Sequence, residues 1–295
     1  KLAKVMASML DEAYKSHEGK QGSSKAQRTP LKEGTGEKEE EITFPPKGFN
    51  KGKLVETPKY KVEFLRKKVC KMFYIDLSIL KEALKFDLSP YLNSYMPWLS
   101  VRLPYCTKVV RHFYANLEYV DDPVRSVVEE EMTTQVRGQT ILISPSRINN
   151  WLGIEDPPDG FIPDLEANQI FALLRPNERI GPLIFNPSDM CDLHRVLWYI
   201  YSRCLVNKSN NFTHFIERDY RNMASILLKE ERNLGEMIFY EIKRHRTSGT
   251  RTTPMPFPQL ISLFLKKNKI WYLEPNEPIE RLIPVGRNQV GKLGI

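Results

Sequence analysis

The sequence predicts a mainly helical domain with a small β-hairpin insertion, preceded by a disordered linker. Apolar residues recur at helical spacing along most of the chain, and the stripe from Asp189 to Val206 is the clearest example. The pattern becomes β-rich and alternating only near residues 127–143. Residues 15–59 contain few apolar side chains, so they cannot bury enough surface to offset the entropy cost of ordering.

These patterns divide the chain into four parts. Residues 1–14 are expected to form a short amphipathic helix, 15–59 the linker, 60–270 the helical domain and 271–295 a C-terminal extension. The linker includes the acidic run Glu37-Lys38-Glu39-Glu40-Glu41. Lys1 in place of an initiator Met is compatible with a fragment of a longer product.

The first elements of the domain follow from capping and turn signals. Asp76 or Ser78 can cap a helix that runs to about Lys85, and a second helix is expected over Pro104 to Glu118. The hairpin is expected to pair Val127–Val136 with Thr140–Ile143 across an Arg137-Gly138 turn. Ser144 as N-cap, Pro145 at the first helical position and Gly153 at the end then predict a helix from Pro145 to Leu152.

The remaining elements are helices separated by breakers. A loop rich in Asp and Pro, residues 156–164, precedes them, and a Pro-rich run at residues 254–258 precedes the last helix. The apolar spacing predicts helices over residues 165–174, 189–206, 213–229, 234–246 and 258–267.

Composition limits the class of protein. The 295 residues are 41% apolar, which is enough to fill a core, and no segment has the apolar length of a membrane span or the features of a signal peptide. Four cysteines are sparse for this length, which fits a reducing compartment: Cys70, Cys106, Cys191 and Cys204. The sequence therefore predicts an intracellular protein without disulfides and without a membrane partner.

Several short motifs lie in a fixed order across about 45 residues. They are Val109-Val110-Arg111-His112-Phe113-Tyr114-Ala115-Asn116-Leu117, Val136-Arg137-Gly138, Ile143-Ser144-Pro145, Ile148-Asn149 and Leu152-Gly153. In this order and spacing the chain resembles the putative plant transposon protein domain, with a weaker similarity from about Tyr60 to Lys269. His112 departs from the pattern, in which an acidic residue is expected. The resemblance implies an origin in a plant mobile element, often beside retroelement-like sequence, and supplies no mechanism.

Each candidate catalytic or metal-binding group is explained better by a structural role or departs from its motif. Asp76 follows the apolar run 72–75, as a two-metal nuclease carboxylate would, but it also precedes a helix and an N-cap explains it.

A zinc site is suggested by four residues: Cys191, His194, Cys204 and His214. However, His194 and Cys204 lie ten residues apart on one predicted helix, about 15 Å along its axis, which is too far for both to bind one zinc ion. Residues 286–292 nearly match a phosphate-binding loop, but Leu293 replaces the required hydroxyl. We therefore predict no catalytic residue, cofactor or metal.

One basic cluster carries the functional prediction. Charge is uneven along the chain, with net values of +3 for residues 1–60, −1 for 61–180 and +6 for 181–295. Within the last part, the residues predicted to contact nucleic acid are Lys243, Arg244, Arg246 and Arg251. Cations at the end of a helix are also favoured by its dipole, so a solvated helix end is the alternative.

The sequence as a whole predicts a non-enzymatic interaction or nucleoprotein module of a plant transposon-derived protein, with weak, non-specific nucleic-acid binding. Its expected partners are nucleic acid and other element-encoded proteins. The alternative is a divergent DNA-processing enzyme, associated with a transposase or integrase, whose catalytic residues lie elsewhere.

Overall fold

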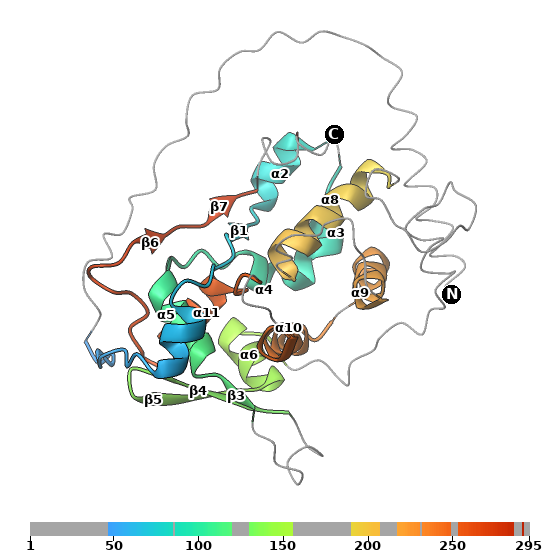
Figure 1. The fold of residues 1–295 in the computed structure, drawn as a ribbon. Coiled ribbons are helices and arrows are strands. Elements are labelled where there is room, and N and C mark those ends of the chain that lie inside the picture. The colour runs from blue at the N-terminus through green and yellow to red at the C-terminus, as the bar shows by residue number, and fades with distance from the viewer. Residues whose placement is uncertain are drawn as a thin grey trace, which may run out of the picture.

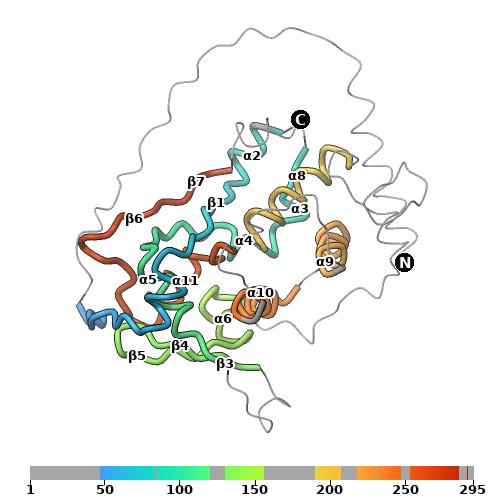
Figure 2. Tube along the Cα trace, viewed as in Figure 1, coloured from blue at the N-terminus to red at the C-terminus, as the bar shows by residue number. Residues whose placement is uncertain are grey.

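A computed structural model describes residues 47–84, 86–119, 130–155, 190–206, 217–230, 232–248, 253–285 and 291 (Figures 1 and 2). Several predictions fall outside these ranges: the helix over residues 1–14, the linker from 15 to 46, the helix over 165–174, and nearly all of the loop at 286–292. No helix in the described ranges combines the length and apolarity needed to cross a bilayer.

Short elements make up the first part of the fold. They are η1 (Tyr60–Phe64), β1 (Phe73–Tyr74), α2 (Leu77–Ala83), α3 (Ser89–Leu92), η2 (Asn93–Tyr95), α4 (Met96–Leu99), β2 (Tyr105–Cys106) and α5 (Thr107–Ala115). Asp76 caps α2 by accepting hydrogen bonds from the backbone of Ser78 and Ile79, as predicted. The helix expected over Pro104 to Glu118 is shorter, because its two ends form strands β2 and β3 (Glu118–Tyr119).

The predicted hairpin and the helix that follows it are confirmed. Strand β4 (Met132–Val136) pairs with β5 (Gln139–Ile143) in antiparallel register, and β3 adds to the other edge of β4. Arg137 and Gly138 have φ angles of 54° and 76°, the left-handed values that a two-residue hairpin turn requires. Helix α6 (Pro145–Leu152) begins after Ser144, whose hydroxyl accepts from the Arg147 N–H, and ends at left-handed Gly153.

The second part of the fold contains the longer helices. They are α8 (Asp192–Ile200), η5 (Tyr201–Leu205), α9 (Glu217–Leu228), α10 (Leu234–Ser248) and α11 (Pro258–Lys267). These confirm the helices predicted at 189–206, 213–229, 234–246 and 258–267 wherever the structure describes them. The end of the first differs, because η5 is a π-helical turn in which the Val206 N–H donates to the Tyr201 carbonyl.

Segments on both sides of residues 60–270 make backbone contacts with that region. The Asn50 N–H donates to the Lys269 carbonyl at 2.7 Å, and the Trp271 N–H donates to the Asn50 carbonyl at 3.0 Å. Downstream, β6 (Ile279–Glu280) pairs with β2 and β7 (Ile283–Pro284) pairs with β1. Residues 47–59 and 271–285 therefore contribute backbone contacts to the region expected to form the helical domain.

Helices α6 and α10 cross closely in the core (Figure 1). Asn149 of α6 is fully buried, and its Nδ2 donates to Asn233 Oδ1 at 2.8 Å. Its Oδ1 accepts from the Gly235 N–H at 2.7 Å, while Asn233 Oδ1 accepts from the Glu236 N–H at 3.0 Å. Asn149 and Asn233 thus cap the N-terminus of α10 together.

Two histidines are buried beside aromatic rings. His112 of α5 stacks on Tyr60 at 4.0 Å between ring centroids, and His245 of α10 lies edge-on to Tyr114 at 5.1 Å. Burial lowers the pKa of His112 to about 4 and that of His245 to about 3. The charged groups around them are Glu56, Lys108 and Arg137 for His112, and Lys67 and Arg244 for His245.

Acid should therefore destabilise the fold through these histidines. An unfolded histidine binds its proton near pH 6.5, whereas both folded imidazoles stay neutral to lower pH. Stability is thus fully present above pH 6.5 and falls as the pH drops toward 4, by about 1.4 kcal/mol per pH unit for each histidine. The free energy of unfolding of the His112→Phe variant can be measured with urea at several pH values between 7 and 4.5. Below pH 6.5 it should fall less steeply with decreasing pH than that of the parent protein, by about 1.4 kcal/mol per pH unit. An unchanged slope would contradict the assignment.

Candidate nucleic-acid interface

Three of the four predicted residues, Lys243, Arg244 and Arg246, lie on the last two turns of α10, where cations complement the helix dipole. The Lys243 Nζ lies 2.6 Å from Glu130 Oε2 and also faces the rings of Tyr119 and Tyr240, at 4.8 and 5.7 Å from their centroids. The hydrogen bond to Glu130 raises the pKa of Lys243. Its ammonium group therefore has an internal counter-ion, Glu130. A phosphate would have to compete with this carboxylate for the ammonium group.

Arg244 is also paired, although half of its side chain is exposed. Its Nε and Nη2 lie 3.0 and 2.7 Å from Glu241 Oε2, and the other oxygen of Glu241 pairs with Arg218 of α9. Only 6% of the Glu241 side chain is exposed, so one buried carboxylate serves two guanidinium groups. Arg218 links α9 to α10 through this carboxylate, whereas Arg244 is paired within α10 and still presents part of its charge to solvent.

Arg246 has a different environment, because it lies near other cations. Its Nε donates to the Leu117 carbonyl at 2.9 Å. Burial is the main cause that lowers the pKa of Lys59 and of Lys67, and the positive charge of Arg246 lowers both further. We call Lys59, Lys67 and Arg246 the basic junction. Glu63 acts in the opposite direction on both lysines, and Glu118 on Lys59.

The sequence analysis missed the two lysines of this junction. Six of the thirteen residues from Lys59 to Lys71 are basic and only Glu63 is acidic. The three consecutive cations at residues 66–68 could have indicated this cluster. They were missed because the net charge was summed over residues 61–180, where acidic residues offset them. Lys61, Arg66 and Lys68 are exposed beside the junction. Arg251, the fourth predicted residue, lies outside the described ranges.

The carboxylate considered as a nuclease group has a structural role. Asp76 caps α2, and its Oδ2 lies 2.9 Å from Arg102 Nη2. Hydrogen bonding, led by the Ser78 hydroxyl, lowers the pKa of this carboxyl. Within the described ranges, no three His, Cys, Asp or Glu side chains are grouped so that they could hold a metal ion. Cys191 and His194 are buried at the start of α8, and all four cysteines are free and buried.

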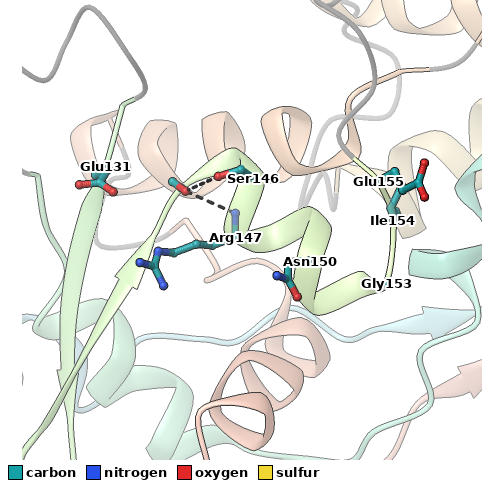
Figure 3. Close-up of a pocket in the computed structure, with 8 residues that line it drawn as sticks. Glu131, Ser146, Arg147, Asn150, Gly153, Ile154 and Glu155 are labelled. Carbon is teal, nitrogen blue, oxygen red and sulfur yellow. Dashed lines mark hydrogen bonds between the residues drawn. The ribbon is translucent and has the colours of Figure 1, made fainter.

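An open polar hollow of about 620 Å³ lies beside α6 (Figure 3). Its lining includes Glu131, Ser144, Ser146, Arg147 and Asn150. Ser144 is already committed to capping α6, and its hydroxyl oxygen lies 3.1 Å from that of Ser146. No histidine or cysteine lines the hollow, so neither serine has the adjacent base that nucleophilic catalysis requires.

A family model described as a putative plant retrotransposon-related domain matches residues 94–270, which is more than half of the chain. The chain belongs to this family. The plant retrotransposon-related domain runs from η2 to the end of α11, so it contains Arg246 but neither Lys59 nor Lys67. Searches of curated proteins and of solved structures found no match.

Membership confirms the transposon association that the motifs indicated, and the protein is transposon-derived. The motif residues have structural roles in the plant retrotransposon-related domain. Ser144, Pro145 and Gly153 bound α6, Asn149 caps α10, and Arg137 forms the hairpin turn. The basic junction, in contrast, combines one residue of the family segment with two that precede it.

Proposed function

We propose that this domain is a non-enzymatic nucleoprotein module that binds the phosphates of nucleic acid without reading base sequence. The observation that carries the proposal is the basic junction, where Lys59 and Lys67 flank η1 and lie close enough to Arg246 of α10 for its positive charge to lower the pKa of both lysines. A polyanion would relieve this repulsion. The exposed cations at residues 61, 66 and 68 extend the same surface.

The interface proposed here differs from the sequence prediction in emphasis. Arg246 is retained and Lys59 is added as a contact residue, whereas Lys67 is only 8% exposed and contributes its charge from beneath the surface. Lys243 contributes least, because Glu130 neutralises it and would repel a phosphate. Contacts of this kind involve charge and not base edges, so we expect similar affinity for unrelated sequences.

The test is a salt titration of binding to a fluorescent 20-base-pair duplex, followed by anisotropy. Each phosphate contact contributes roughly 0.9 to the slope of log affinity against log salt. Replacing Lys59 and Arg246 by glutamine should therefore reduce the magnitude of the slope by about 1.8. Lys243→Gln should change it little.

The matched control is a Lys81→Gln, Lys267→Gln variant, which removes the same charge from α2 and from the end of α11. Its slope should equal that of the parent protein. If the control and the junction variant behave alike, the junction is a solvated surface. Metal-dependent cleavage of the duplex would instead support the alternative of a DNA-processing enzyme.

A further inference from the structure

The outer face of η1 is an exposed surface of mixed apolar and basic character. Tyr60 and Phe64 point into the core, and Tyr60 stacks on His112 of α5. Their neighbours Val62 and Leu65 face solvent, with 70% and 45% of each residue exposed. Exposed cations alternate with these apolar side chains. We call Lys61, Val62, Leu65, Arg66 and Lys68 the η1 face.

The chemistry of the η1 face specifies its ligand. Two large aliphatic side chains so exposed on one short element favour burial by a partner. The three exposed cations of this face outnumber Glu63, the exposed carboxylate of η1, so the net charge favours a partner that is acidic. The expected ligand is therefore a short segment in which carboxylates adjoin large apolar side chains.

The chain carries such a segment just upstream of its described part. Residues 37–44 read Glu-Lys-Glu-Glu-Glu-Ile-Thr-Phe, so four carboxylates precede Ile42 and Phe44. Only Pro45 and Pro46 separate this segment from Lys47, where the description begins. The six residue-to-residue steps from Glu41 to Lys47 can span about 20 Å. Within the intervening chain, Glu56 Oε1 lies 3.9 Å from Lys108 Nζ of α5, the helix against which η1 packs.

We infer that residues 37–44 bind the η1 face within the same molecule, with their glutamates on Lys61, Arg66 and Lys68 and their apolar side chains on Val62 and Leu65. This regulatory inference rests on the proposed function, since the η1 face borders the basic junction. Carboxylates placed there compete with phosphates for the same cations. The acidic segment therefore weakens nucleic-acid binding, and short tethering gives it a high effective concentration.

Docking is tested without nucleic acid by carbodiimide cross-linking of the full chain. The carbodiimide activates a glutamate carboxyl, a lysine amine attacks it, an amide bond forms, and the carbodiimide leaves as a urea. Mass spectrometry should find amides joining Glu39, Glu40 or Glu41 to Lys61 or Lys68. These should disappear in about 1 M salt, where the Debye length is only about 3 Å.

A second cross-linking test replaces the two apolar residues of the η1 face. The Val62→Ser, Leu65→Ser variant keeps every reactive lysine and should lose most of these cross-links. Ile79→Ser, at an exposed aliphatic residue of α2, should retain them. Cross-links spread evenly over Lys81, Lys266 and Lys267 would overturn the inference.

Duplex binding separates this inference from the proposed function. Replacing Glu39, Glu40 and Glu41 by glutamine should raise affinity roughly tenfold at low salt. The matched variant at Glu82, Glu155 and Glu280 should raise it much less. Cross-links without duplex binding by any variant would refute the proposed function and leave the docking intact. Equal gains in the two triple variants, without specific cross-links, would refute the docking alone.

Discussion

Replacing Arg137 by glutamine is expected to lower the free energy of unfolding by about 3 to 5 kcal/mol. Only 5% of this side chain is exposed, and its guanidinium joins three segments distant in sequence. Nε donates to the Trp271 carbonyl at 2.8 Å, Nη1 to the Gly52 carbonyl at 2.5 Å, and Nη2 to the Leu273 carbonyl at 3.0 Å. Nη2 also pairs with Glu274. Glutamine reaches none of these acceptors in the same geometry, so buried carbonyls and a carboxylate lose their donor.

Urea unfolding followed by circular dichroism measures this effect. Arg147→Gln is the control, because that arginine is exposed on α6 and its loss should cost less than about 0.5 kcal/mol. Arg137→Lys should fall between the two, since one ammonium cannot reproduce a guanidinium fork. A loss below about 1 kcal/mol in Arg137→Gln would show that the clamp is not needed to hold residues 50–52 and 271–274.

Elements defined by local signals were predictable from sequence. Helix α6 begins and ends at the expected residues because Ser144, Pro145 and Gly153 each act on the backbone beside them. The turn at Arg137-Gly138 followed from the same kind of signal. The cap by Asp76 also depends only on residues 78 and 79. Such interactions span a few residues, so a sequence pattern contains all that they require.

Interactions between distant segments were not predictable in this way. Residues 47–59 resemble a linker in composition, yet Asn50 bridges to Ile270, which is 220 residues away. Arg137 was recognised as a turn residue and not as a clamp, because its acceptors are backbone carbonyls that carry no sequence signature. Contacts of this kind join segments far apart in the chain, so no local sequence pattern indicates them.

The candidate interface shows the same division. The sequence located Arg246 at the end of a helix, where the dipole favours it. It did not reveal that Glu130 neutralises Lys243 from 113 residues away, or that Lys59 and Lys67 approach Arg246. Tertiary packing decides which cations retain unneutralised charge. A count of charges along the chain therefore cannot identify these cations.

The second large effect is expected at Gly235, where substitution by alanine should destabilise the protein by about 3 kcal/mol or more. A methyl group there would lie 2.0 Å from the Pro145 carbonyl oxygen and 2.7 Å from Asn149 Oδ1. The first of these is backbone and cannot rotate away. Helices α6 and α10 would have to separate, which would break the hydrogen bond from the Gly235 N–H to Asn149.

The sign of this effect distinguishes close packing from helix propensity. In an exposed helix, replacing glycine by alanine stabilises by about 1 kcal/mol, so propensity alone predicts the opposite result. Urea unfolding of Gly235→Ala decides between them. Combining it with Asn149→Ala removes the side-chain obstacle but leaves the Pro145 carbonyl, so the double variant should not recover stability. Recovery would place the clash on Asn149 alone, and a gain in stability of Gly235→Ala would show that the helices are not in such close contact.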